Sequence, residues 1–280
     1  MKFDRGKWLI IIGVIVFVIL VSVIGMLVWN DVSNAEKEDN EMVNKVVEPV
    51  ITRSDNEYFE GKKLVAITFD DGPGYAVTEY LLDELDKRDA KVSFFLVGNR
   101  IEKQAELVKR MHNSGHTIGN HSYSHKSFKK QKPESYLYEI NRTNQLIKDI
   151  TGEDVIFVRP PYGSYKKSTL ENVNMNFVLW SVDTEDWKSR NADMVYEEMT
   201  TDIEDGDIIL LHDLYQTSAD AAIRAIDYLL ENGYAVVSLY EMYRLRGETP
   251  EMHKSIRHFH IEVKEENTEI NEEKKEETSN

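Results

Sequence analysis

Short apolar runs alternate with amphipathic stretches along most of this chain. The apolar runs are rich in β-branched and aromatic residues and end at polar or turn-forming residues, a pattern typical of buried strands. They cover residues 64–69, 92–97, 155–158, 177–180, 207–211 and 234–237. The stretches between them carry apolar residues at helical spacing and cover 77–85, 101–111, 133–152 and 222–230. This alternation predicts an α/β fold in which helices cover parallel strands.

Polar residues that could carry chemistry follow the apolar runs directly. They are Asp70, Asp71, His121, His125, Arg159, Asp183, Asp186 and His212. In a β/α barrel the carboxyl ends of the strands meet at one mouth, so residues far apart in sequence converge there. An open doubly wound sheet gathers ligands at one switch point only. The spread over several strand ends therefore favours a barrel.

The first thirty residues contain an uncharged apolar stretch, residues 8–29, which is long enough to cross a bilayer. Basic residues precede it and acidic residues follow it. The positive-inside rule then places residues 1–7 in the cytoplasm and the rest of the chain outside. A signal peptide is the alternative, since Ser33-Asn34-Ala35 offers the small residues that a signal peptidase needs. Both interpretations export the domain.

Polar segments flank the predicted folded domain, which we place at residues 61–247. Residues 30–60 are charge-rich and predict a stalk between membrane and domain. Residues 248–280 end in a run dominated by glutamate, which predicts a disordered acidic tail. His253, His258 and His260 precede this run without a carboxylate pattern to partner them, so we expect surface histidines.

The net charge and the cysteine content exclude some classes of function and of metal site. The net charge of −16 argues against nucleic-acid binding, which needs a basic footprint. The chain has no cysteine, so disulfides and thiolate ligands are excluded, and a metal would have to bind histidine and carboxylate side chains. The absence of disulfides from an exported protein suggests a bacterial source. Together with the expected span at residues 8–29, this predicts a single-pass protein of the bacterial cell membrane. We expect a monomer.

His121 and His125 lie four positions apart, which allows both imidazoles to lie on one side of a single turn. A nearby carboxylate from Asp70-Asp71 would complete a His-His-Asp set for a divalent cation. Such a site with an open coordination position activates water, so the pattern indicates hydrolysis. The histidine pair alone also occurs by chance on helix surfaces.

Five short segments together make the chain resemble the NodB-type polysaccharide deacetylases, or carbohydrate esterase family 4. They are Thr68-Phe69-Asp70-Asp71-Gly72, His121-Ser122-Tyr123-Ser124-His125, Arg159-Pro160-Pro161-Tyr162-Gly163, Asp183-Thr184-Glu185-Asp186-Trp187 and Leu210-Leu211-His212. The resemblance spans about residues 62–245. It implies a distorted (β/α)7-type barrel, here preceded by the expected transmembrane helix.

The resemblance also implies a role for each residue. The metal ligands would be Asp71, His121 and His125, with zinc as the default ion and cobalt or nickel as alternatives. Asp70 would be the general base, kept ionised and aimed by Arg159.

On the leaving-group side, His212 resembles the family's general acid, and Asp186 would raise its pKa through a hydrogen bond. The backbone N–H of Tyr162 would donate to the oxyanion. Trp187 and Leu210 would line a pocket for the acetyl methyl group, with plain core packing as the alternative.

The reaction implied by the resemblance is metal-dependent removal of an N-acetyl group from a sugar, releasing acetate. A domain outside a bacterial membrane faces peptidoglycan, so N-acetylglucosamine in this cell-wall glycan is the expected substrate. Chitin oligomers, poly-N-acetylglucosamine and acetylxylan are the alternatives within the family. Outside it, we consider a glycosidase that uses Asp70 and Asp186, and an inactive wall-binding protein.

Overall fold

The predicted alternation of strands and helices is confirmed in the computed structural model, which describes residues 56–88 and 90–261. The strands are β1 (Lys63–Asp70), β2 (Ser93–Leu96), β3 (Thr117–Asn120), β4 (Phe157–Val158), β5 (Asn176–Val178), β6 (Val182–Asp183), β7 (Asp207–His212), β8 (Tyr234–Val236) and β9 (Ser255–Ile256). The α-helices are α2 (Asn56–Phe59), α3 (Ala76–Arg88), α4 (Gly98–Ile101), α5 (Ala105–Asn113), α6 (Pro133–Thr151), α7 (Lys167–Asn172), α8 (Asp186–Ser189), α9 (Ala192–Thr200), α10 (Gln216–Glu231) and α11 (Leu239–Arg246). Two 3-10 turns, η1 (Phe128–Lys130) and η2 (Pro161–Gly163), complete the described elements.

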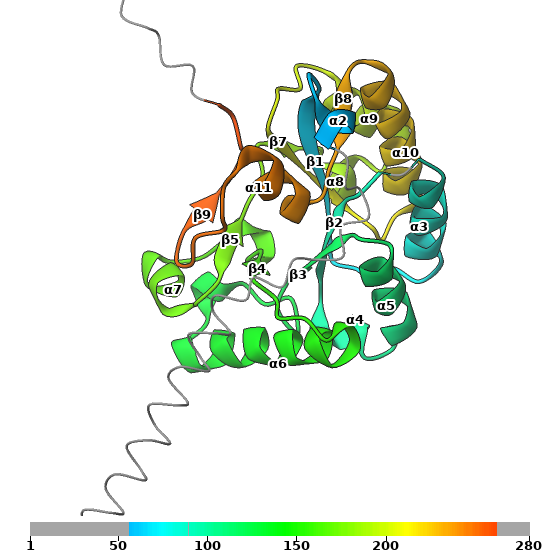
Figure 1. Cartoon of the computed structure of the whole chain (residues 1–280). Coiled ribbons are helices and arrows are strands. Elements are labelled where there is room, and N and C mark those ends of the chain that lie inside the picture. The colour runs from blue at the N-terminus through cyan, green and yellow to red at the C-terminus, as the bar shows by residue number, and fades with distance from the viewer. Residues whose placement is uncertain (1–55, 89, 262–280) are drawn as a thin grey trace, which may run out of the picture. The chain divides into compact units, whose positions relative to one another are not determined.

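The strands form a sheet in the order β6-β7-β1-β2-β3-β4-β5-β9, with β8 also paired to β1. The ladders that join these strands are parallel. Because β6 and β9 end the path within the described residues, the sheet is a half-barrel rather than a closed ring (Figure 1). An isolated bridge between Asp207 and His258 brings the segment after β9 to the start of β7. The parallel α/β class is therefore confirmed.

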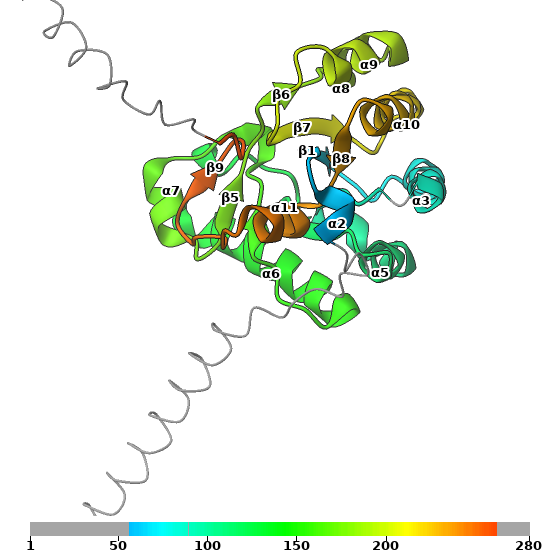
Figure 2. The ribbon, with the colours of Figure 1, turned by 45° about the horizontal axis from the view of Figure 1, so that its top comes forward.

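The larger helices cover the outside of this sheet. Figure 1 and the turned view in Figure 2 show α9, α10, α3, α5 and α6 following one another around the strands. Their apolar faces pack on the strands, as Leu81, Leu82 and Leu85 of α3 do. Helix α6 begins with proline at its first position and ends at Gly152, whose φ of 81° provides a left-handed cap.

Strand β1 shows how the sheet separates core from site. Val65, Ile67 and Phe69 belong to the core cluster beneath the outer helices. Leu64 and Ala66 belong to a second cluster inside the curved sheet. Because side chains alternate along a strand, Thr68 and Asp70 continue this inner face. The apolar inner face of β1 thus becomes polar at its carboxyl end.

Several short elements of the structure were not predicted from the sequence pattern. Strand β6 has two residues, and helices α7 and α8 are four to six residues long, too short for a periodic signal. The fold also continues past the boundary expected at residue 247. Strand β9 pairs with β5, and the buried ring of Phe259 contacts Tyr243 with the two centroids 4.7 Å apart.

Within the part of the chain that the structure describes, no helix is both long and apolar enough to cross a bilayer. The span expected at residues 8–29 lies outside the described residues, as do most of the expected stalk and residues 262–280.

Candidate active site

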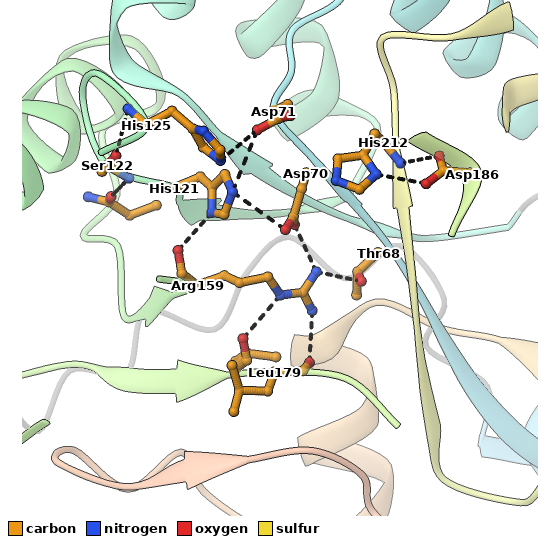
Figure 3. Close-up of polar contacts among 12 residues, drawn as sticks. Thr68, Asp70, Asp71, His121, Ser122, His125, Arg159, Leu179, Asp186 and His212 are labelled. Carbon is orange, nitrogen blue, oxygen red and sulfur yellow. Dashed lines mark hydrogen bonds and ion pairs between the residues drawn. The ribbon is translucent and has the colours of Figure 1, made fainter. Parts of the chain in front are cut away.

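The residues predicted to act together converge at the carboxyl ends of the parallel strands. In the register of the sheet, Asp70 of β1 lies opposite His212 of β7. Asn120 of β3 lies opposite Val158 of β4, so the next residues, His121 and Arg159, are also neighbours. The strand register therefore brings together chemical groups that are up to 142 residues apart, as Figure 3 shows.

Asp71, His121 and His125 form a cluster whose ligand atoms all lie within 4.8 Å of one another. Asp71 Oδ1 lies 3.1 Å from His125 Nε2 and 3.6 Å from His121 Nε2 (Figure 3). Among the described residues this is the group of histidine and carboxylate side chains arranged to hold a metal ion.

A histidine can bind a cation only through a ring nitrogen that carries no proton, so the position of the His121 ring proton shows whether this cluster fits a metal ion. His121 Nδ1 lies 2.7 Å from the carbonyl oxygen of Arg159, so Nδ1 carries the proton and Nε2 presents its lone pair to the carboxylates. Burial lowers the pKa of His121 to about 3, which keeps the ring neutral. Asp71 Oδ1, opposite, is buried without a hydrogen-bond partner in the described structure. Two acceptors that face each other in this way fit a bound divalent cation.

The loop that carries the two histidines is held by its own polar groups. Asn120 Oδ1 accepts the backbone N–H of Ser122 at 2.7 Å, and Ser122 Oγ accepts that of His125 at 3.0 Å. Ser122 and His125 have φ angles of 65° and 56°, a left-handed conformation that is unfavourable for side-chain-bearing residues. The histidines therefore lie in an irregular bend and not on a helical turn.

Arg159 lies fully buried beneath Asp70 and is held by four hydrogen bonds. Its Nη1 donates to Asp70 Oδ1 at 2.8 Å and to Thr68 Oγ1 at 2.8 Å. Nε and Nη2 donate to the carbonyl oxygens of Val178 and Leu179. The predicted pairing of Asp70 with Arg159 is present. Burial nevertheless raises the pKa of Asp70 above its ordinary value, against the opposing effect of Arg159. This carboxylate is thus more basic than a simple arginine pair would make it.

The partly exposed His212 forms a second pair with the buried Asp186. Asp186 Oδ1 lies 2.7 Å from His212 Nδ1, and Oδ2 accepts the backbone N–H of His212 and the hydroxyl of Ser218. Burial alone would lower the pKa of His212, but the hydrogen bond and charge of Asp186, helped by Asp70 and Asp71, raise it to about 9. The ring is therefore an imidazolium at neutral pH, as a general acid requires.

A pocket of about 360 Å³ joins these groups. It is lined by Asp70, Asp71, His121, His125, Tyr162, Trp180, Asp183, Trp187, Leu210, His212 and Tyr215. Leu210 is buried, whereas Trp187 and Tyr162 are 51% and 70% exposed at its rim, so core packing does not explain the two aromatic residues. Tyr162 has a φ of 62° and its ring contacts that of His125.

Trp180 and Tyr215 line the pocket although they were not predicted as site residues from the sequence. Trp180 ends a predicted strand and Tyr215 follows His212 by three positions, so an aromatic residue near a strand end was the available signal. Asp183, whose role the sequence left open, accepts hydrogen bonds from Trp180 Nε1 and the backbone N–H of Glu185.

Comparison with known proteins gives consistent matches. A family model described as polysaccharide deacetylase matches residues 59–177. The peptidoglycan-N-acetylmuramic acid deacetylase PdaC of Bacillus subtilis is 37% identical over 187 residues, which cover 67% of this chain and 40% of PdaC. A peptidoglycan-N-acetylglucosamine deacetylase of Bacillus cereus is 37% identical over 194 residues, covering 67% of this chain and 70% of the relative. The chain thus spans about two-fifths of the length of PdaC and over two-thirds of the second relative.

A solved structure supports the same relationship. A family 4 acetyl xylan esterase from Clostridium thermocellum, in complex with a cobalt ion, aligns with a TM-score of 0.68 and 34% sequence identity. The alignment covers 71% of this chain and 100% of the esterase. With the strand-end residues in place and a relative covered over most of its length, the chain belongs to the polysaccharide deacetylase family, carbohydrate esterase family 4.

Proposed function

We propose that this chain removes the acetyl group from N-acetylglucosamine residues of a cell-wall glycan, with peptidoglycan as its substrate. The observation that carries the proposal is the position of Asp70 and His212, a base and an acid on adjacent strands beside the Asp71–His121–His125 cluster. Amide hydrolysis needs this combination, because one proton must leave the attacking water and another must reach the leaving nitrogen.

Asp71, His121 and His125 would hold a divalent cation, and we propose zinc because two imidazoles and one carboxylate suit it. When bound, the cation would polarise the acetyl carbonyl and lower the pKa of a water molecule. Cobalt, the ion in the related esterase, has the same ligand preferences.

The proton transfers follow from the Asp70–Arg159 and His212–Asp186 pairs. Asp70 uses Oδ1 to bind Arg159, so Oδ2 accepts the proton of the attacking water. The water oxygen bonds to the acetyl carbon, which leaves a negative charge on the acetyl oxygen, and the carbon–nitrogen bond breaks when this tetrahedral species collapses. His212 binds Asp186 through Nδ1, which leaves its Nε2 proton for the departing amine nitrogen. Acetate and a free amino sugar result.

The remaining predicted residues contribute to binding. The left-handed backbone of Tyr162 is proposed to aim its N–H at the oxyanion that forms on the acetyl oxygen. Leu210 and Trp187, both in the pocket lining, offer apolar surface to the acetyl methyl group.

The pocket lining favours a neutral sugar. Among the described residues that line it, three carboxylates are present but neither lysine nor arginine. The lactyl group of N-acetylmuramic acid carries a carboxyl group or a peptide. The lining offers it no lysine or arginine, and the protonated His212 is committed to the leaving amine. We therefore propose N-acetylglucosamine, as named for the Bacillus cereus relative, over the muramic acid named for PdaC.

For location, we propose that residues 8–29 anchor the chain in a bacterial cell membrane with the catalytic domain outside. The uncharged length of this stretch and the basic residues before it support the proposal. Membrane fractionation of cells, followed by protease treatment of intact protoplasts, should digest the domain while the chain stays in the membrane fraction. A domain that is protected in intact protoplasts would contradict this topology.

The test of the activity is acetate release from peptidoglycan, chitin oligomers and acetylxylan by the full chain, followed by mass spectrometry of the glycans. We expect each released acetate to leave one glucosamine in an otherwise intact glycan. A chelator and Asp70→Asn should each stop the release. Shortened glycans, with activity that survives chelation, would indicate a glycosidase instead. No release from any substrate would favour the inactive wall-binding protein.

A further inference from the structure

We propose that Asp213 is a positioning residue. It connects the loop of residues 72–75, which follows the metal ligand Asp71, to the end of the strand that carries the general acid His212. The inference rests on the proposed function for the roles of these two residues. Asp213 follows His212 directly, is fully buried and takes no part in the proton transfers described above. A carboxyl group buried beside the site needs a structural explanation, because burial of a polar group is unfavourable without partners.

The connection runs through Thr78, the third residue of α3. Thr78 Oγ1 accepts the backbone N–H of Gly74 at 2.6 Å and donates to Asp213 Oδ2 at 2.5 Å. Thr78 is also fully buried, so water does not compete for these bonds. One hydroxyl thus links the loop after β1 to the residue after β7.

The two chain segments approach each other closely at this point. A Cβ atom on Gly72 would lie 2.3 Å from both carboxylate oxygens of Asp213. A Cβ atom on Gly74 would lie 2.0 Å from the backbone oxygen of Asp213. Both distances are too short for any side chain. The glycines that follow Asp71 therefore allow the loop to pack directly against Asp213.

The same loop is also held by Gln104, the residue that caps the start of α5. Its Nε2 donates to the carbonyl oxygen of Pro73 at 2.7 Å, and its Oε1 accepts the backbone N–H of Tyr75 at 2.9 Å. Together, the contacts of Gln104 and of the Thr78–Asp213 pair hold residues 72–75 in one position. Asp71, at the start of the loop, has a φ of 73°, a conformation that such contacts must maintain.

A displaced loop would have two measurable consequences. The carboxylate of Asp71 would no longer face the two histidines, so metal affinity would fall. Asp70, one residue before, would also shift relative to His212, which would slow the reaction more than it weakens glycan binding. Residues that orient metal ligands typically change metal affinity by about 10- to 100-fold when they are removed.

The experiment measures zinc affinity of the metal-free full chain by competition with a fluorescent chelator, together with kcat and KM for the glycan. The variants are Thr78→Val, Asp213→Ala and Asp213→Asn. Thr117→Val is the control, because Thr117 is also buried and its hydroxyl also accepts a backbone N–H, that of Tyr240, at the opposite end of a strand from the site. Thermal melting of each metal-free variant reports its stability.

We expect Thr78→Val and Asp213→Ala each to weaken zinc binding at least about tenfold and to lower kcat more than they change KM. Asp213→Asn should restore most of the affinity, since its amide oxygen can still accept the Thr78 hydroxyl. The double variant Thr78→Val/Asp213→Ala should be little worse than either single change, because both break one connection.

Native zinc affinity and kcat in Thr78→Val and Asp213→Ala, with a loss of stability like that of Thr117→Val, would overturn the proposal. If the unsubstituted chain binds zinc but releases no acetate from any glycan, the proposed function fails. The zinc affinities of the variants would then still decide the role of Asp213.

Discussion

Asp186 holds His212 through both of its carboxylate oxygens: Oδ1 lies 2.7 Å from the ring Nδ1, and Oδ2 accepts the backbone N–H at 2.8 Å. A carboxylate bound in this way fixes the tautomer and orientation of the ring as well as its charge. The pair therefore links the geometry of the site to its pH dependence, since only the protonated ring can donate to the leaving amine.

The activity should fall at alkaline pH because the general acid loses its proton. The pKa of His212 is raised to about 9, so the imidazolium persists at neutral pH and disappears as the pH rises through that value. This pKa lies above the value of about 6.5 for an unfolded histidine, so the pair also stabilises the folded state. The stabilisation is fully present below about pH 6.5 and is lost as the pH rises through about 9. The pH profile of kcat tests the first statement and thermal melting between these pH values tests the second.

Asp186→Asn should move the alkaline limb of this profile toward neutral pH, because the charge that raises the pKa of His212 is lost. We expect kcat at pH 7 to fall by about 10²- to 10⁴-fold, because the amide also no longer fixes the tautomer and orientation in which the ring donates from Nε2. Ser218→Ala is a useful control, since it removes one hydrogen bond to Asp186 but leaves the carboxylate charge. An unchanged alkaline limb in Asp186→Asn would show that another group supplies the proton.

Asp70→Asn should lower kcat by about 10²- to 10⁴-fold, because an amide cannot accept a proton from the attacking water. Zinc affinity should change little, since the ligand set of Asp71, His121 and His125 stays intact. Parallel measurement of zinc binding and acetate release separates these effects. Native activity in this variant would exclude Asp70 as the base.

Removal of the metal should abolish acetate release and lower the melting temperature. A ligand present at about 100 times its Kd stabilises the native state by about 2.7 kcal/mol. Differential scanning calorimetry with and without zinc measures this shift, and His125→Ala should eliminate most of it. Zinc should restore both activity and melting temperature to the chelated protein. A melting temperature that does not respond to zinc would contradict the predicted site.

Arg159→Met should destabilise the fold by about 3–5 kcal/mol, because it leaves the buried carboxylate of Asp70 without its cation. Urea unfolding gives this free energy. The double variant Asp70→Asn/Arg159→Met should lose less than the sum of the single changes, since the ion pair couples the two sites. Additive losses would indicate that the hydrogen bonds of Arg159 to Thr68, Val178 and Leu179 dominate instead.

The sequence alone was sufficient for the order of the main elements and for the set of polar residues at the strand ends. The apolar run 64–69 became β1, and the helical spacing that begins at Pro133 became α6, because local periodicity reflects which face is buried. The segments of the five motifs were equally readable, since their residues are close neighbours in the chain. Short elements such as β6 and β9 carry too few residues for such a signal.

Only the tertiary structure decided which of these residues touch one another. Strand register placed Asp70 opposite His212, and burial raised the pKa of Asp70 although Arg159 opposes that change. The contact of Asp213 with Thr78 joins residues 135 positions apart, and no local pattern encodes such a distance. Sequence periodicity reports which side of an element is buried. Distances, desolvation and the partners of buried polar groups exist only once the strands are aligned side by side.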